Sequence, residues 1–115
     1  MRRGEIVTVN LDPARGSEAS KTRPAVVVSN DAASATATRL GRGVVIVVPV
    51  TSSIERVYPF QVLLPAGQTG LARDSKAQAE QIRSVAVERI GKRIGQLPVT
   101  LVTELDHAIR IHLSL

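Results

Sequence analysis

The chain has 115 residues and no cysteine, so we expect one domain over residues 1–115 in a reducing compartment, with neither a disulfide framework nor a thiolate metal site. No apolar run reaches the roughly 20 residues of a membrane helix, and the basic start Met1–Arg3 leads into Gly4 and Glu5, so we expect a soluble, cytoplasmic protein without membrane contact. The formal charge of +5 favours a polyanionic partner, although Arg-rich usage also follows from a GC-rich genome.

The first third of the chain predicts two strands joined by a polar loop. Residues 5–11 place Val7, Val9 and Leu11 on one face, which is the period of a half-buried strand. The apolar residues within 23–29 predict the next strand. Functional residues often lie in loops that rigid strands hold. The same segment also fits an ordinary surface loop.

The loop before the second strand carries one carboxylate, Glu18, and two cations, Lys21 and Arg23. Pro24 fixes its own φ and biases Arg23 toward extended backbone. We therefore expect the guanidinium of Arg23 to project from a defined point at the start of the strand.

The middle of the chain predicts one short helix and more strands. Residues 31–39 fit a helix with Asn30 or Asp31 as N-cap. The run 43–51 follows a Gly-Arg-Gly turn, and its apolar first half predicts a central strand covered on both faces. Further strands are expected at 59–64, 75–82 and 85–89, with a half-exposed stretch at Lys76–Gln78.

The end of the chain predicts an amphipathic helix after Pro98, with Thr100 as its N-cap. The expected apolar stripe, which would pack against the sheet, consists of Leu101, Val102, Leu105, Ala108, Ile109, His112 and Leu113. His107 and His112 are five apart and so point to different faces, which favours one solvated and one half-buried histidine over a catalytic or metal-binding pair. The predicted fold is mainly β, a strongly curved antiparallel sheet or barrel with a C-terminal helix.

Six short motifs occur in a characteristic order: Gly16-Ser17-Glu18, Arg23-Pro24, Asn30-Asp31, Pro49-Val50-Thr51-Ser52, Arg73-Asp74-Ser75 and Glu80-Gln81-Ile82-Arg83. With this ordered set the chain resembles the MazF/PemK/Kid toxin family over nearly its whole length. The resemblance implies an SH3-like barrel of the PemK/CcdB type and a sequence-specific, metal-independent endoribonuclease of a type II toxin–antitoxin pair, without a cofactor. It also implies a homodimer and an acidic MazE-like antitoxin that competes with single-stranded RNA.

The resemblance further implies which residues act on RNA. Arg23 and Thr51 would face the scissile phosphate: the guanidinium stabilises the phosphorane and the hydroxyl donates a hydrogen bond, while Glu18 is the nearest candidate base for the ribose 2′-OH. A guanidinium stays charged at neutral pH and is a poor base. The residues expected to hold or read RNA are Ser17, Ser20, Lys21, Ser52, Arg56, Arg73, Asp74, Ser75, Glu80 and Gln81.

Several of these residues have an equally good structural interpretation. Glu80 and Arg83 fit ion pairs inside a dimer as well as RNA contacts, and Arg56 fits a solvated loop arginine. Tyr58 and Phe60 are the only aromatic residues, so base recognition would depend on hydrogen bonds and arginine more than on aromatic stacking.

Two other functions also fit the sequence. A non-catalytic toxin with the same barrel could act on a protein target such as a DNA topoisomerase, although such a toxin need not keep Arg23 and Thr51. A basic SH3-like binding module for nucleic acid or an acidic peptide fits the charge equally well. Cleavage of naked RNA distinguishes both from the enzyme.

Overall fold

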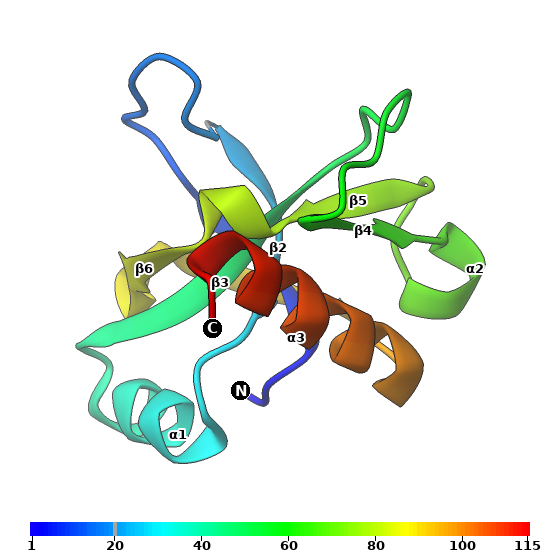
Figure 1. The fold of residues 1–115 in the computed structure, drawn as a ribbon. Helices are drawn as coiled ribbons and strands as arrows, with labels where there is room; N and C mark the ends of the chain where they lie inside the picture. The colour runs from blue at the N-terminus through cyan, green and yellow to red at the C-terminus, as the bar shows by residue number, and fades with distance from the viewer. Residues whose placement is uncertain (20) are drawn as a thin grey trace.

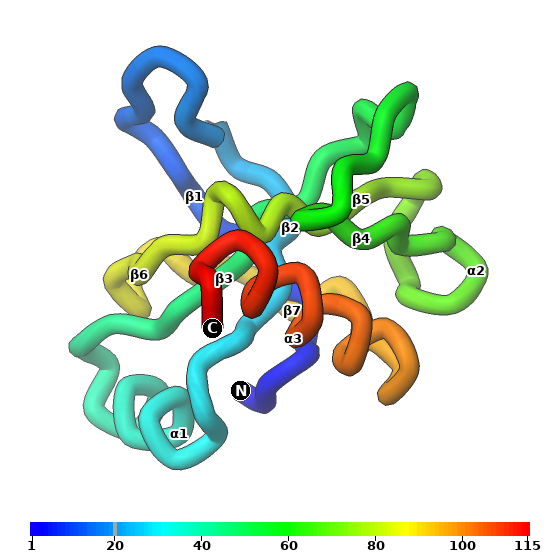
Figure 2. Tube along the Cα trace, in the orientation of Figure 1, coloured from blue at the N-terminus to red at the C-terminus, as the bar shows by residue number. Residues whose placement is uncertain are grey.

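The computed structural model describes residues 1–19 and 21–115 (Figures 1 and 2). Its strands are β1 (Glu5–Asn10), β2 (Thr22–Val27), β3 (Val44–Thr51), β4 (Gln61–Leu64), β5 (Ser75–Gln78), β6 (Arg83–Ala86) and β7 (Ile90–Gln96). Its helices are α1 (Asp31–Leu40), α2 (Ala66–Thr69) and α3 (Val99–Leu113), with the short 3₁₀ turns η1 (Ala79–Gln81) and η2 (Val87–Arg89).

The strands form one antiparallel sheet in the order β4-β5-β3-β2-β1-β7, and β6 pairs with the first half of β3. Across the described residues the order does not return to its starting strand, so the sheet curves without closing into a complete barrel. A curved antiparallel sheet with a C-terminal helix, the predicted fold class, is confirmed.

The core lies on both faces of this sheet. In β1, Ile6 packs into the cluster beneath α3, whereas Val7 and Val9 pack into a second cluster on the opposite face. Neighbouring side chains of a strand point to opposite faces, so a sheet covered on both sides needs apolar residues at successive positions. The predicted alternation of Val7, Val9 and Leu11 is confirmed, because all three are buried.

Strand β3 is central as predicted, but the expectation that its apolar run is covered on both faces is wrong for its first half. Val45 and Val47 are buried, whereas Val44 is 58% and Ile46 is 40% exposed. Val45 and Val47 belong to the second cluster, whereas Val48 and Val50 pack into the cluster beneath α3. The first half pairs with β6 alone on one edge, and its outward face lacks a covering element among the described residues.

The strand predicted over 75–82 ends earlier, because the chain turns into η1 at Ala79. The predicted strand 85–89 is divided in the same way between β6 and η2. The half exposure expected for Lys76–Gln78 is also wrong: Lys76 is 8% exposed and Ala77 is fully buried. The lysine tolerates this position because its Nζ donates a hydrogen bond to the Arg56 carbonyl at 2.6 Å.

Helix α1 is confirmed, with the Asn30 side chain accepting a hydrogen bond from the Ala33 backbone N–H at 2.8 Å. For α3 the predicted cap is wrong: Pro98 is the N-cap and Thr100 lies inside the helix. The helix therefore begins two residues earlier than a cap at Thr100 would place it.

The buried stripe of α3 consists of Leu101, Leu105 and Ala108, with Val102 and Ile109 packed at its margin. The stripe predicted to continue through His112 and Leu113 is wrong, because both side chains are exposed. His107 is exposed as well, so the half-buried histidine is also not found.

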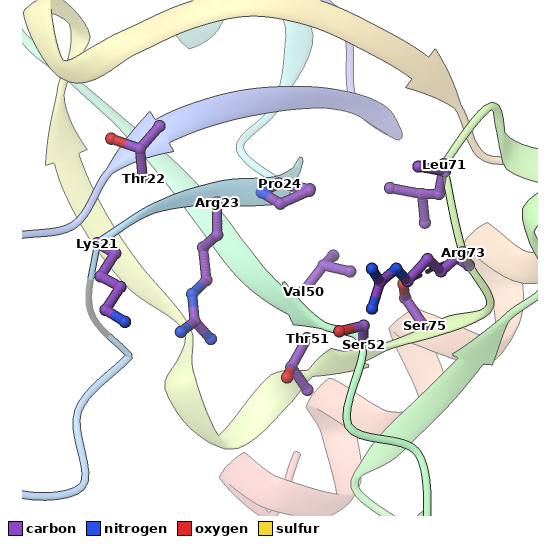
Figure 3. A pocket seen from close by; sticks show the side chains of 11 residues that line it. Lys21, Thr22, Arg23, Pro24, Val50, Thr51, Ser52, Leu71, Arg73 and Ser75 are labelled. Atoms are coloured by element: carbon purple, nitrogen blue, oxygen red, sulfur yellow. Dashed lines mark hydrogen bonds between the residues drawn. The ribbon is translucent and has the colours of Figure 1, made fainter.

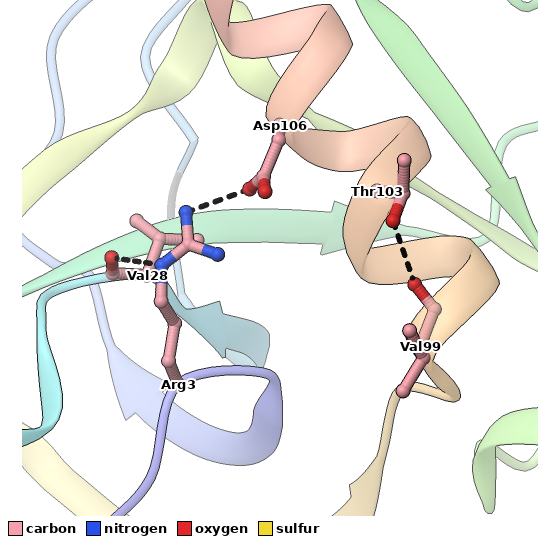
Figure 4. A network of polar contacts seen from close by, with 5 residues as sticks. All are labelled: Arg3, Val28, Val99, Thr103 and Asp106. Carbon is pink, nitrogen blue, oxygen red and sulfur yellow. Dashed lines mark hydrogen bonds and ion pairs between the residues drawn. The ribbon is translucent and has the colours of Figure 1, made fainter.

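A polar network fixes α3 to the start of the chain (Figure 4). Arg3 forms an ion pair with Asp106 at 2.7 Å, and its Nε donates to the Val28 carbonyl at 2.9 Å. At the other end of the helix, Thr103 donates its hydroxyl hydrogen to the Val99 carbonyl. Among the described residues no helix is both long and apolar enough to span a bilayer.

Candidate active site

Sheet register brings Arg23 and Thr51 together. Strands β2 and β3 are antiparallel with Ala25 opposite Pro49. The pairing ends there; Arg23 and Thr51 are the positions two residues beyond this pair, and alternate residues of a strand share one face. The Arg-Pro step and the Pro-Val-Thr step, far apart in the sequence, therefore present one guanidinium and one hydroxyl at the same edge of the sheet.

These two side chains line a pocket with a volume of about 310 Å³ (Figure 3). Three segments build it: the start of β2, the end of β3, and the connection from α2 to β5. Its described lining consists of Lys21, Thr22, Arg23, Pro24, Val50, Thr51, Ser52, Leu71, Ala72, Arg73 and Ser75. Six residues predicted for catalysis or RNA binding thus converge at one place: Lys21, Arg23, Thr51, Ser52, Arg73 and Ser75.

The pocket is cationic. Lys21, Arg23 and Arg73 bring three positive charges to its wall, and its described lining includes no acidic residue. Hydroxyl groups from Thr51 and Ser52 lie between the cations. A concave site with several cations and hydroxyl donors is suited to a phosphate group.

Thr51 is held in a defined rotamer. Its Oγ1 accepts a hydrogen bond from the Ser53 backbone N–H at 3.2 Å. This bond uses a lone pair of the oxygen and not its hydrogen, so the hydroxyl can donate to an oxygen atom in the pocket. Ser75 is 5% exposed and donates its own hydrogen to the Arg73 carbonyl at 2.9 Å, which fixes the turn that carries Arg73.

The two carboxylates predicted near the site bind backbone instead of lining the pocket. Glu18 Oε1 accepts from the Arg15 N–H at 2.6 Å, and Asp74 Oδ1 accepts from the Ala66 N–H at 2.9 Å, where α2 begins. In this structure Asp74 therefore holds the α2–β5 connection, and Glu18 holds a turn in the β1–β2 loop.

Glu80 and Gln81 also lie outside the pocket lining. Glu80 Oε2 accepts from Gln61 Nε2 at 2.7 Å, and Gln81 exchanges hydrogen bonds with the backbone of Ser17 and Ala19. Arg56 lies over the Tyr58 ring and donates to the Tyr58 hydroxyl at 3.2 Å. Ser20, predicted to bind RNA, lies outside the described residues.

Sequence reasoning missed the apolar part of the wall, Leu71 and Ala72. It also missed Gln61 and Lys76, whose side chains hydrogen-bond to the backbone of the β3–β4 loop. Leu71 lies two residues before the Arg-Asp-Ser motif and is buried, so its apolar character was the available signal. Phe60, half-buried, stacks on Tyr58 with ring centroids 5.4 Å apart and meets the His112 ring at 5.7 Å. The chain's only two aromatic side chains are therefore in contact, on the loop that follows β3.

Known proteins share the sequence pattern of this chain. A family profile described as PemK-like, MazF-like toxin of type II toxin–antitoxin system matches residues 2–113. The curated endoribonuclease MazF9 of Mycobacterium tuberculosis is 66% identical over 115 residues, which cover 100% of this chain and 98% of that protein.

Solved structures show the same fold. A crystal structure of MazF from Deinococcus radiodurans superposes with a TM-score of 0.80 at 26% identity, covering 100% of this chain and 97% of that one. A chain of the MazE–MazF crystal structure from the same organism gives a TM-score of 0.72 at 25% identity, with 100% and 97% covered. The protein therefore belongs to the PemK-like, MazF-like toxins of type II toxin–antitoxin systems.

Proposed function

We propose that the protein is an endoribonuclease toxin that cleaves single-stranded RNA at specific sequences, without a metal ion, at the pocket between β2, β3 and the α2–β5 connection. The observation that carries the proposal is the convergence of Arg23, Thr51 and Arg73 on one cationic pocket. The endoribonuclease named MazF9, which is 66% identical over the whole chain, supports the reaction class.

The reaction needs charge stabilisation above all. When the ribose 2′-oxygen attacks phosphorus, a bond from that oxygen forms, the bond to the 5′-oxygen breaks, and negative charge grows on the non-bridging oxygens. The 2′-hydroxyl loses its proton to a base, and the leaving 5′-oxygen takes up a proton from Arg23 or from water, so the products are a 2′,3′-cyclic phosphate and a 5′-hydroxyl. Arg23, half-buried at the start of β2, supplies a fixed positive charge for the phosphorane.

Thr51 acts beside it as a hydrogen-bond donor to the same phosphate. The bond from Ser53 N–H orients the hydroxyl oxygen, so little reorganisation is needed when the phosphate binds. Lys21 and Arg73 flank this pair and would bind neighbouring phosphates of the strand. Glu18 remains the candidate base, and it has to leave the Arg15 N–H to reach a 2′-hydroxyl.

Cleavage of a long single-stranded RNA in excess EDTA tests the proposal, with the ends mapped by primer extension. We expect discrete cuts by the parent protein that survive EDTA, and a fall in kcat of about 10²–10³ in Arg23→Ala, the loss typical for removal of one group that stabilises transition-state charge. Thr51→Ala should fall in the same direction.

Matched controls are Arg42→Ala and Thr100→Ala, two exposed positions outside the pocket. Both should cut like the parent. Intact RNA with a folded parent protein would contradict the proposal and favour a non-catalytic toxin acting on a protein target or a basic binding module. Cuts that vanish in EDTA would contradict its metal independence.

The partners follow from the same site. We propose a homodimer in the cytoplasm and an acidic antitoxin related to MazE, whose disordered segment covers the cationic pocket and competes with RNA. The net charge of +5 supports an acidic partner, and many charge contacts can offset the entropy lost when a disordered segment orders. The MazE–MazF crystal structure that this chain resembles supports the type of antitoxin.

A further inference from the structure

Two long loops stand on either side of η1: the β1–β2 loop (11–21) and the β3–β4 loop (52–60) (Figure 1). The first ends in Lys21 and the second begins with Ser52, and both of these residues line the pocket. Long loops without helix or strand are ordinarily mobile. The hydrogen bonds that hold these two loops therefore determine how the loops lie beside the pocket.

Gln81 is the last residue of η1. Its side-chain amide holds the β1–β2 loop by hydrogen bonds to main-chain atoms of that loop. Its Oε1 accepts from the Ala19 N–H at 3.0 Å, and its Nε2 donates to the Ser17 carbonyl at 2.9 Å. Both ends of the amide are thereby used on a segment more than sixty residues away in the sequence. The side chain of Ala19 is 8% exposed and packs into the core, which adds an apolar contact at the same point.

Glu80, the neighbouring residue, reaches toward the β3–β4 loop. Its Oε2 accepts from Gln61 Nε2 at 2.7 Å, and Gln61 Oε1 in turn accepts from the Tyr58 N–H at 3.1 Å. Two consecutive residues of one short turn therefore tie down one loop each.

The turn itself is rigidly placed. Ala79 is fully buried in the core cluster beneath α3, Ile82 packs against the same cluster, and α3 contacts η1 directly. Because η1 is fixed in the core, the loop atoms that hydrogen-bond to it are held in defined positions, although these loops have few core contacts of their own.

We propose that Glu80 and Gln81 are positioning residues that set the separation of the two loops beside the pocket, and that Gln81 does so by preorganising the β1–β2 loop for RNA. The proposal rests on the ribonuclease function proposed above. Without the Gln81 bonds the loop is free to sample other conformations, and RNA has to order it on binding. Arg23 and Thr51 lie on strands and keep their places. Glu18, the candidate base, lies in the loop itself between Ser17 and Ala19, so loss of the Gln81 bonds weakens RNA binding and lowers kcat only as far as Glu18 acts in the chemical step.

Gln81→Met tests this, because methionine keeps nearly the same volume and loses both hydrogen bonds. Without RNA present, we expect hydrogen exchange at the Ala19 amide and tryptic cleavage after Arg15 to become about tenfold faster, as for the loss of one or two ordinary hydrogen bonds. Exchange at the Tyr58 amide should stay unchanged, because the Glu80 and Gln61 bonds hold that loop.

Gln61→Met provides the converse measurement, with faster exchange at Tyr58 and unchanged exchange at Ala19. Gln68→Met, at an exposed position of α2, is the matched control and should behave like the parent in every assay. In RNA cleavage we expect Gln81→Met to raise KM about fivefold to tenfold. In a Glu18→Gln background, where the candidate base is already removed, its effect on kcat should stay within a factor of about two, the signature of lost binding rather than lost chemistry.

The two readouts separate the two proposals. Unchanged exchange and proteolysis in Gln81→Met would overturn the positioning role even if the parent cuts RNA. A parent protein that leaves RNA intact, combined with faster loop exchange in Gln81→Met, would overturn the ribonuclease and leave the support of the loop standing. A fall in kcat at unchanged KM that persists in the Glu18→Gln background would assign Gln81 itself to the chemical step and contradict its role in preorganising the loop.

Discussion

At the scale of single residues, several polar side chains near the pocket bind backbone and not one another. Asp74 caps the start of α2, Lys76 satisfies the Arg56 carbonyl, and Arg89 donates to the Asn10 carbonyl at 3.1 Å and also to the Asp12 carbonyl. Each of these bonds fixes a loop that carries or neighbours a pocket residue. Polar residues of this kind look like ligand contacts in a sequence, because the sequence does not show which groups are used for support.

Glu18 allows a direct test of whether such a side chain acts on the substrate or only holds the backbone. If it is the base that accepts the 2′-hydroxyl proton, Glu18→Gln should lower kcat by about 10²–10⁴, the usual range for general base catalysis. The glutamine keeps an oxygen that can accept from the Arg15 N–H, so the turn itself should persist. The measurement is single-turnover cleavage over a range of pH.

Glu88→Gln, at an exposed carboxylate in η2, is the matched control and should cleave like the parent. A Glu18→Gln enzyme with parental kcat would limit Glu18 to its backbone contact. Catalysis would then depend on the positive charge and hydroxyl of Arg23 and Thr51.

At the scale of elements, the β3 strand and the helices α1 and α3 could be predicted because their residue patterns are strong. Strand β7 was missed, since Gly91, Lys92, Arg93 and Gly95 interrupt any apolar period and the strand holds few buried side chains. Helix α2 was missed for a related reason: four residues, two of them polar and one a glycine, carry no helical pattern. Both are held by tertiary contacts that a local pattern cannot show.

The contact between α2 and β7 is unusually close. A Cβ on Gly95 would overlap the carbonyl oxygen of Thr69, and one on Gly70 would lie 3.1 Å from the Ile94 carbonyl oxygen. Gly70 also has φ +85, in the left-handed region that favours glycine. The segment that follows, Leu71–Arg73, forms one wall of the pocket, so this contact sets where Arg73 lies.

Gly95→Ala should therefore destabilise the protein by about 1–3 kcal/mol, because a backbone atom of Thr69 has to move. Urea unfolding measures the change. Gly67→Ala is the control: a Cβ there meets nothing within 4 Å, and alanine in place of glycine inside a helix should stabilise by up to about 1 kcal/mol. Equal stability of the two variants would contradict the close contact.

The site could be predicted in part for a similar reason. Arg23, Thr51 and Arg73 are side chains in short motifs, and their convergence on one pocket follows from strand register and the α2–β5 turn. The support by Gln61 and Gln81 could not be read from the sequence, because a glutamine that binds distant backbone leaves no partner residue type to recognise.

At the scale of the whole molecule, the positive charge should govern how the protein meets RNA. Affinity for single-stranded nucleic acid falls with salt, with a log–log slope of about −0.7 for each phosphate neutralised. Removing one cation from the pocket should therefore reduce the slope by about 0.7. Arg73→Ala is the variant of choice, because Arg73 is an exposed residue of the pocket wall and is not assigned to the chemical step.

The measurement is fluorescence anisotropy with a 2′-O-methylated single strand, which lacks the hydroxyl needed for cleavage. Arg42→Ala removes an equal charge at an exposed position outside the pocket and should leave the slope close to that of the parent. A slope that changes equally in both variants would show that net charge, and not the pocket, determines binding.

The pocket draws its wall from residues 21–24, 50–52 and 71–75, and β1 acquires its outer neighbour only when β7, residues 90–96, is in place. A growing chain on the ribosome therefore lacks a wall of the pocket until about two thirds of it has emerged, and lacks the edge strand until later still. A toxin built this way acquires its active centre only near the end of its own translation. Under the proposed function, an unfinished copy of the chain would lack the complete pocket needed to cleave the message that encodes it.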